Sequence, residues 1–304
     1  MQPSDTTAAV GRRRSTSILG QPAVGPTTGS RRKRRSEQFF THLILILVVI
    51  TLVTPFIYVI SASFKDSKSI FAYPPSLLPI PPYTGNYERL ISETGFVRWI
   101  ANTFFVATVV TVLKVFLDSM AGYALAKLRF RGKRFVFASL LILLMVPLGV
   151  LIVPLWTVAH TLGINDTYLA LILPPLANPL GVFLMRQFIL SLPNDLENAA
   201  RLDGVSEFGI YRRIILPLVK PGLVVLAIIV FTDQFMSFIW PLVSTSSDDL
   251  QVLTVGLASF RAKGGVDYGI WSAAAIMSLV PIAIFFFVLQ RQFLARNLAG
   301  ALKQ

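Results

Sequence analysis

Six apolar runs alternate with polar segments along the chain, and they cover residues 39–61, 101–124, 134–156, 168–189, 222–243 and 270–290. Each run is close to the twenty or so helical residues that cross roughly 30 Å of hydrocarbon. Backbone groups in lipid must bond internally, so runs of this length form helices. The alternating segments of about ten residues typical of a membrane barrel do not occur. The pattern predicts an all-α, polytopic membrane protein with six transmembrane helices.

The positive charges fall unevenly between the two sides of the predicted helices. Of 28 Lys and Arg residues, 21 lie in the N-terminal tail, the second-to-third and fourth-to-fifth connections and the C-terminus, against six on the other side. Lys and Arg accumulate on the cytoplasmic side of membrane proteins, so both termini are expected in the cytoplasm. The net charge of +13 is then mainly a topology signal, and we expect no nucleic-acid partner.

The first 36 residues differ in composition from the rest. They are rich in Ser, Thr, Gly, Pro and Arg and have few large apolar residues, so they cannot bury a core. We expect a disordered basic cytoplasmic tail over residues 1–36 and a six-helix transmembrane domain over residues 37–304. The basic cluster at residues 31–35 precedes the first span, where such clusters meet anionic headgroups, so membrane lipid is an expected partner.

The chain has few residues suited to catalysis or metal binding. It has no cysteine, and its two histidines, His42 and His160, are far apart in sequence. No Gly-rich phosphate-binding loop is present, so a nucleotide would have to bind another subunit. We therefore expect a non-catalytic chain that itself binds neither a cofactor nor a metal.

The connection over residues 190–221 is polar and longer than two neighbouring helices require. Asn194 and Asp195 can cap the start of a short helix, and Gly204 can take the left-handed conformation that ends one. Ser206 can then cap a second short helix. This pattern is compatible with a docking surface for a cytoplasmic protein and with an amphipathic hairpin lying on the headgroups.

Four polar residues inside the spans are candidates to line a substrate path. Lys114 and Asp118 are four apart, hence on one helix face, and burying either charge alone would cost about 2.5 to 3.5 kcal/mol. We expect them to pair, either as structural neutralisation or in a cavity. Asp233 and Gln234 face the pathway or pair with another helix.

Two further path candidates lie close to span ends. Trp240 fits an anchor at the membrane interface or a platform on which a ligand ring stacks. Asn102 opens the predicted second span and fits either a helix cap or a ligand contact.

The segment Glu197-Asn198-Ala199-Ala200-Arg201-Leu202-Asp203-Gly204, followed by Leu216-Pro217, resembles the "EAA" loop of binding-protein-dependent ABC importer permeases. Residues 63–87, 121–133 and 290–303 resemble other segments of the carbohydrate importers in this family, close to the maltose-type second permease. The resemblance covers nearly the whole chain after residue 38. It implies an ABC importer type I permease architecture in which the loop couples to the ATPase subunit through Glu197, Asn198, Ala199, Ala200, Asp203, Gly204, Leu216 and Pro217.

The resemblance also implies partners. These are a second homologous permease, two ATP-binding subunits that hold ATP and Mg, and an extracellular or periplasmic substrate-binding protein that meets residues 65–98 and 244–268. The expected location is the inner cell membrane of a prokaryote, and the expected cargo is a sugar or oligosaccharide. A non-sugar solute such as glycerol phosphate stays open, and so does an ion-coupled carrier that titrates Asp118 and Asp233.

One position departs from the family motif. The family's glutamate directly before the Ala-Ala pair is Asn198 here, and Glu197 lies one place earlier. Either an uncharged hydrogen bond replaces the ionic contact, or Glu197 substitutes for it. Adjacent helical positions point about 100° apart, so substitution by Glu197 would require a shift in docking.

Overall fold

A computed structural model describes residues 28–74, 76–262 and 267–301, and these residues form helices and no strand. The helices are α1 (Thr28–Ser63), α2 (Ser67–Ile70), α3 (Gly85–Ser92), α4 (Phe96–Lys127), α5 (Lys133–Leu144), α6 (Leu148–Thr161), α7 (Tyr168–Leu176), α8 (Leu180–Leu190), α9 (Asp195–Leu202), α10 (Glu207–Ile210), the π-helical turn η1 (Tyr211–Ile215), α11 (Leu216–Leu218), α12 (Lys220–Phe235), α13 (Ile239–Ser244), the 3-10 turn η2 (Asp248–Leu250), α14 (Leu253–Ala262) and α15 (Tyr268–Ala301). The chain divides into two units, Met1–Pro55 and Phe56–Gln304. Most of the predicted disordered tail lies outside the described residues, and α1 begins at Thr28.

Three helices, α1, α4 and α15, are long and apolar enough to cross a membrane alone. Three helix pairs are long and apolar enough to cross a membrane when each pair is taken together, but each pair is bent. The bend is 107° between α5 and α6, 42° between α7 and α8, and 78° between residues 207–218 and α12. If each bent pair is one span, the described residues hold six crossings. The predicted all-α, polytopic membrane fold is confirmed.

Three of the predicted spans are not continuous helices, which corrects the sequence-based boundaries. The run at 168–189 breaks between α7 and α8, at residues 177–179. The run at 134–156 breaks before Pro147, whose backbone is extended, and α6 starts one residue later. Proline disfavours the helical conformation of the preceding residue and cannot donate a backbone hydrogen bond. The run at 222–243 breaks after Phe235, where α12 ends, and resumes as α13.

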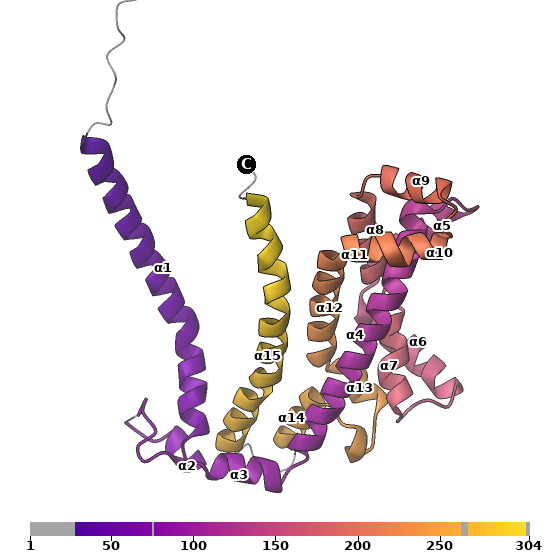
Figure 1. The fold of residues 1–304 in the computed structure, drawn as a ribbon. Coiled ribbons are helices and arrows are strands. Elements are labelled where there is room, and N and C mark those ends of the chain that lie inside the picture. The colour runs from indigo at the N-terminus through magenta and orange to yellow at the C-terminus, as the bar shows by residue number, and fades with distance from the viewer. Residues whose placement is uncertain (1–27, 75, 263–266, 302–304) are drawn as a thin grey trace, which may run out of the picture. The chain divides into compact units, whose positions relative to one another are not determined.

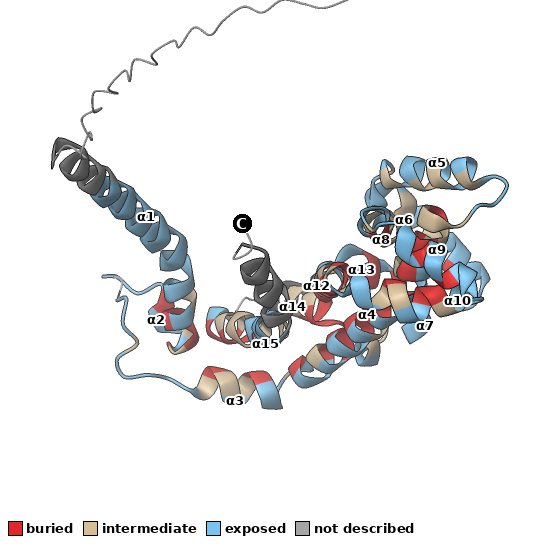
Figure 2. Cartoon of the chain, turned by 45° about the horizontal axis from the view of Figure 1, so that its top comes forward, coloured by how far each residue is buried: buried red, intermediate tan, exposed pale blue. Residues whose placement is uncertain are grey.

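The second unit is built around α4, which packs against α8 and α12. Figure 2 shows buried positions along α4 in this region. Two glycines bring α4 and α8 close together. A Cβ on Gly122 would lie 2.7 Å from Met185 Cβ, and one on Gly181 would lie 1.8 Å from Asp118 Oδ2. Small residues at such contacts allow helices in membranes to pack closely.

The two ends of α4 meet different parts of the chain. In Figure 1, α9 and α10 lie at one end, whereas α3 and α14 lie near the other. At 1.5 Å per residue, the 32 residues of α4 separate these ends by roughly 48 Å. The same helix therefore positions both the 190–221 loop and the segments at its far end.

Candidate functional site: the 190–221 loop

The 190–221 loop contains two short helices that meet at a glycine, as the sequence predicts. Gly204 has a φ of +75°, a conformation that glycine adopts without steric cost. Its backbone N–H donates to Arg201 O at 3.1 Å, and the N–H of Val205 donates to Ala200 O at 3.0 Å. These two bonds satisfy the last carbonyls of α9 in the pattern that commonly ends helices. Ser206 Oγ then accepts from Gly209 N at 3.2 Å and caps α10.

Two local predictions in this loop are wrong. Asn194 precedes α9 but has helical backbone angles and makes no side-chain cap; its Oδ1 instead accepts a hydrogen bond from Lys127 Nζ at 2.6 Å. The second helix is not one regular α-helix, because it widens into the π-helical turn at Tyr211–Ile215 before α11. Single π turns of this kind occur often at functional sites.

One face of the loop is buried against the membrane-spanning helices. Ala200, Ile210 and Ile215 belong to the same apolar cluster as Met185 and Ile189 of α8. This apolar contact removes the loop's inner face from water, which favours one fixed position. The alternative of a hairpin that lies only on headgroups does not account for this packing.

Three polar side chains of α4 fasten the loop to the end of that helix. Ser119 Oγ and Tyr211 OH lie 2.8 Å apart, Tyr123 OH donates to Glu207 Oε2 at 2.7 Å, and Lys127 Nζ contacts Glu197 Oε1 at 2.8 Å. Ser119, Tyr123 and Lys127 are spaced by four residues, hence on one face of the helix. Sequence reasoning missed this role, although the spacing of polar residues at the end of an apolar span was the available signal.

Of the four carboxylates of the loop, Glu197 and Glu207 form ion pairs. Glu197 is 2% exposed and lies between Lys127 and Arg201, whose Nη2 is 3.5 Å from Glu197 Oε2. Arg201 also pairs with Glu207, with Nε 2.7 Å from Oε1. The hydrogen bond to Glu207 raises the pKa of the Arg201 guanidinium above its usual range, although burial opposes the shift. Glu197 therefore points inward and does not reach the surface that Asn198 occupies.

The opposite face of the loop is exposed. Asn198, Ala199, Asp203 and Gly204 all lie on it. Asn198 Oδ1 accepts from Arg201 Nη1 at 3.3 Å. The motif proline, Pro217, is also exposed, whereas Leu216 is half-buried.

Leu202 and Phe208 are the most exposed large apolar side chains of the loop, and Leu196 is 47% exposed. Leu202 is 90% exposed and Phe208 is 58% exposed. Removing such side chains from water would stabilise a complex with a partner. Leu202 was not among the residues that the sequence analysis selected for this site.

Asn102 is neither a helix cap nor an open ligand contact in this structure. It lies within α4, which begins at Phe96, and it is buried. Its Nδ2 donates to Asp249 O at 2.8 Å and Gln251 O at 2.9 Å, and its Oδ1 accepts from Tyr168 OH at 2.8 Å. Asn102 thus joins α4 to the loop before α14.

Lys114 and Asp118 pair as predicted, with Nζ 2.9 Å from Oδ2 and both side chains 4% exposed. Lys114 Nζ also donates to Asn178 O at 2.7 Å. Asn178 lies in the break between α7 and α8, where carbonyls lack their usual helical partners. The buried pair therefore neutralises both charges and supports this break, which agrees with the structural interpretation.

The remaining path candidates differ from one another. Trp240 is buried and its Nε1 donates to Ala170 O at 2.8 Å, so in this structure it neither anchors at an interface nor offers an open stacking face. Asp233 is exposed on α12 and accepts from Gln234 Nε2 at 3.1 Å. Of the six candidates, Asp233 and the half-buried Gln234 retain access to solvent or to a neighbouring subunit.

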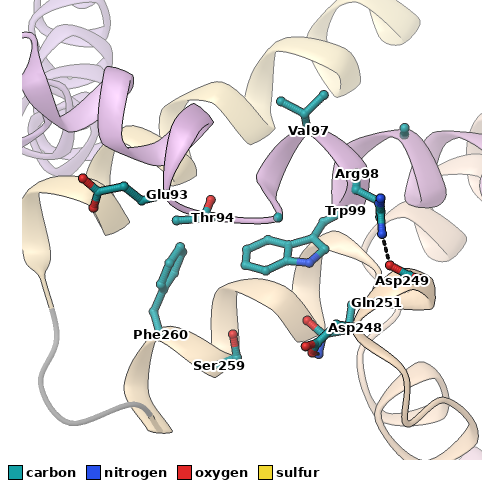
Figure 3. Close-up of a pocket in the computed structure, with 12 residues that line it drawn as sticks. Glu93, Thr94, Val97, Arg98, Trp99, Asp248, Asp249, Gln251, Ser259 and Phe260 are labelled. Carbon is teal, nitrogen blue, oxygen red and sulfur yellow. Dashed lines mark hydrogen bonds and ion pairs between the residues drawn. The ribbon is translucent and has the colours of Figure 1, made fainter.

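A pocket of about 680 Å³ lies at the other end of α4, between the start of that helix and the region of η2 and α14. Figure 3 shows Trp99 and Phe260 on its wall; their rings are 5.7 Å apart and arranged edge to face. Arg98 forms an ion pair with Asp249 across the pocket rim. The described parts of the 65–98 and 244–268 segments therefore form one surface, which we call the cap.

The cap is also tied together away from the pocket. Arg89 Nη1 donates to Asp267 Oδ2 at 2.8 Å, and Ser67 Oγ donates to Asp267 Oδ1. Burial raises the pKa of the Asp267 carboxyl, but the hydrogen bonds together outweigh burial and hold this pKa below its usual value. The carboxylate thus stays charged and joins the two segments.

Comparison with known proteins gives a consistent family. Residues 118–297 match the family model described as "Binding-protein-dependent transport system inner membrane component". The chain is 36% identical to the arabinooligosaccharides transport system permease protein AraQ of Halalkalibacterium halodurans, over 89% of this chain and 99% of that protein. It is 33% identical to the sn-glycerol-3-phosphate transport system permease protein UgpE of Brucella abortus, over 86% of this chain and 96% of that protein.

The fold also has a close counterpart among solved structures. A chain of a bacterial ABC transporter involved in the import of the acidic polysaccharide alginate superposes with a TM-score of 0.76 at 22% identity, covering 86% of this chain and 98% of that chain. At this identity, the likeness concerns the fold alone.

Proposed function

The chain belongs to the family of binding-protein-dependent transport system inner membrane components, and from this premise we propose that it is the permease subunit of an ATP-driven importer for a sugar or oligosaccharide. In this role it supplies half of the translocation pore and catalyses no reaction. The observation that carries the proposal is the 190–221 loop, which is fixed to α4 and leaves Leu202 and Phe208 exposed.

The loop has the features of a docking element for an ATP-binding subunit. Its inner contacts with α4 and α8 give it one position, so a force applied to its exposed face passes into the spans. Exposed Leu202 and Phe208 supply apolar area for a partner, and Asn198 and Asp203 supply hydrogen-bonding groups around it. Hot spots of protein interfaces commonly combine an apolar centre with a polar rim.

The absence of a charge at Asn198 shapes this contact. Glu197 is used internally by Lys127 and Arg201, so it does not replace a surface carboxylate at the neighbouring position. We therefore propose that Asn198 meets the ATP-binding subunit through uncharged hydrogen bonds.

The assembly follows from the family. We propose a second homologous permease for the other half of the pore, two ATP-binding subunits below the loop, and a substrate-binding protein on the cap. Both termini and the loop then lie in the cytoplasm, in agreement with the distribution of Lys and Arg. Closure of the ATP-binding subunits on ATP and Mg would move the loop, and α4 would carry that movement to the cap as a rigid-body rotation.

The substrate class rests on the relatives. Their names give arabinooligosaccharides and sn-glycerol 3-phosphate as cargo, and both are polyhydroxylated. Exposed Asp233 and half-buried Gln234 are the candidates on this chain for hydrogen bonds to such a solute. An ion-coupled carrier is less well supported, because Asp118 is already paired with Lys114.

Substitution of Gly204 tests the coupling role. Proline fixes φ near −65°, which is incompatible with the +75° at Gly204, so Gly204→Pro should reshape the loop but leave the apolar spans unchanged. In proteoliposomes with the cognate partners, we expect membrane insertion to persist and ATP-dependent sugar uptake to fall at least tenfold. Normal uptake by this variant would refute the coupling role.

A pair of leucine variants tests the docking face. Leu202→Glu places a charge in the proposed contact and should prevent co-purification of the ATP-binding subunit. Leu78→Glu introduces the same change at an exposed position of the cap and should retain that subunit. If both variants keep the ATP-binding subunit, Leu202 is not part of the docking face.

A further inference from the structure

A second pocket, of about 580 Å³, lies where the end of α4 and the start of α5 approach α9 and α10. We call it the basic pocket, and its charged lining residues are Lys127, Arg129, Lys133, Glu197, Arg201 and Glu207. Four of these side chains are cationic and two are carboxylates. The lining therefore carries an excess of positive charge.

Both carboxylates of the basic pocket are already neutralised. Glu197 pairs with Lys127 and Arg201, and Glu207 pairs with Arg201 and accepts from Tyr123 OH. The positive charges of Lys127 and Arg201 are thus balanced within the protein. The excess positive charge is therefore that of Arg129 and Lys133.

Those two cations have unused hydrogen-bonding capacity. Lys133 Nζ donates to Ala126 O at 3.2 Å and Leu128 O at 2.9 Å, and an ammonium has three N–H groups. Arg129 is exposed and makes no hydrogen bond or ion pair in the part of the chain that the structure describes. Arg129 and Arg186 also lie close enough to Lys133 for mutual repulsion. An anion bound here would remove that repulsion.

Large apolar side chains stand exposed beside these cations. Phe130 follows Arg129, and on α5 Phe135 is 78% exposed, with Val136 and Ile142 also exposed. Basic residues interleaved with exposed aromatic and aliphatic side chains are typical of contact with an anionic membrane surface. Because α5 belongs to a helix pair long and apolar enough to cross a membrane, acyl chains lie against this apolar face, and a lipid headgroup is the anion nearest to the cations.

We propose that the basic pocket binds the phosphate of an anionic phospholipid, whose acyl chains lie along the exposed apolar face of α5. Arg129 and the free N–H of Lys133 contact the phosphate. Asn198 and Arg201 line the same pocket, so the lipid borders the loop proposed to dock the ATP-binding subunit. The inference requires insertion of the chain in a membrane and does not depend on which solute is carried.

The test is a lipid titration of the purified full-length chain in detergent, followed by native mass spectrometry. Phosphatidylglycerol and phosphatidylcholine with identical acyl chains are compared. We expect phosphatidylglycerol to bind at least fivefold more tightly, since one basic residue near a headgroup accounts for roughly that factor. Equal retention of the two lipids would overturn the proposal.

Two matched variants locate the site. Arg129→Gln should reduce the preference for phosphatidylglycerol by about fivefold, and a conservative Arg129→Lys should restore most of it. Arg212→Gln removes an exposed cation of the 190–221 loop that does not line the pocket and should leave the preference unchanged. An equal loss in both Gln variants would mean that binding is non-specific, and the proposed site would be wrong.

Two further measurements distinguish a phospholipid from other anions that could occupy the basic pocket. Addition of inorganic phosphate at millimolar concentration should leave the bound lipid in place, and complete displacement would identify a site for free phosphate. The assembled transporter should keep the lipid, and its loss on addition of the ATP-binding subunit would assign the pocket to an acidic side chain of that subunit. Either result would overturn the lipid assignment. Ordinary uptake by Arg129→Gln alongside lost lipid preference would leave the transport proposal intact.

Discussion

The two ends of α4 hold their neighbouring segments in different ways. At the 190–221 loop, Tyr123 and Lys127 bind the carboxylates of Glu207 and Glu197. At the cap, Asn102 binds the backbone carbonyls of Asp249 and Gln251, and Thr103 Oγ1 accepts from the backbone N–H of Leu253 at 2.8 Å. The loop end therefore relies mainly on buried side-chain contacts, to which Lys127 Nζ adds a bond to Leu192 O at 2.9 Å. The buried contacts at the cap end are with the backbone, and the Arg98–Asp249 side-chain pair there is exposed.

This difference indicates how many amino-acid substitutions each segment can tolerate. Contacts with backbone atoms persist when the side chains of the loop before α14 are replaced, so that loop can vary to suit a partner. Contacts with Glu197 and Glu207 require those carboxylates, so the inner face of the 190–221 loop tolerates little substitution. The following predictions test this contrast, from the largest expected effect to the smallest.

Removal of Lys127 should have the largest effect. Lys127→Met leaves Glu197 buried with only the more distant Arg201 beside it, and breaking a buried ion pair from one side costs about 3 kcal/mol. Thermal unfolding of the purified chain should show this loss as a lower Tm. The double variant Lys127→Met, Glu197→Met should recover much of it, because no charge is then left buried. A single variant as stable as the wild type would contradict the assigned role of the pair.

Removal of Asn102 should have the next largest effect. Asn102→Ala leaves two loop carbonyls and Tyr168 OH without their partner, and unsatisfied buried polar groups cost about 2 kcal/mol. The matched change Asp249→Ala removes a side chain whose ion pair with Arg98 is exposed, and it should cost less than about 0.5 kcal/mol. Both are measured by thermal unfolding. Equal losses would refute the claim that the cap is held through its backbone.

Loss of the Tyr211 hydroxyl should have a smaller effect. Tyr211→Phe keeps the buried ring but removes the hydrogen bond to Ser119, which typically contributes about 1 kcal/mol. Ser119→Ala should give a similar loss, and the double variant should cost little more than either alone. The free energy of unfolding of the two single variants and the double variant forms a double-mutant cycle. If the two losses of unfolding free energy add, the two hydroxyls do not bond to each other.

A pH effect at Asp166 should be the smallest and should be confined to acid. The N–H groups of Ser247 and Ser246 donate to Asp166 Oδ1 at 3.0 and 2.8 Å, and these bonds lower the pKa of the Asp166 carboxyl. A lowered folded-state pKa means that the contribution is present above the ordinary pKa and is lost as the pH falls through the folded value. The protection factors of the amide hydrogens of residues 246 and 247, which correct for the intrinsic pH dependence of exchange, should therefore fall below about pH 4. Asp166→Asn, which tolerates the φ of +58°, should abolish that pH dependence.

The sequence predicts the number and location of the apolar segments well, but it does not predict where they bend. Pro147 marks a 107° bend, whereas Pro55 and Pro281 lie inside continuous helices. A proline frees the same backbone groups in each case, and neighbouring structure decides whether they are satisfied. That information depends on tertiary packing, so local pattern could not supply it.

The same limit applies to the candidate site. Gly204 and Ser206 were predictable, because a helix end and a helix cap depend on neighbouring residues. The inward position of Glu197 was not, because it depends on Lys127, which is seventy positions away in sequence. The burial of Asn102 and Trp240 was not predictable for the same reason, since their partners are distant in sequence.

The uninterrupted course of α4 has a mechanical consequence. Among the helices and helix pairs long enough to cross a membrane in the described residues, α4 is the one that has neither a proline nor a break. Kinks arise mostly at prolines and at disrupted helical turns, so α4 resists twisting and bending along its length. Torque applied by the proposed ATP-binding subunits would pass along α4 to the cap with little loss, whereas the bent pairs would absorb part of it.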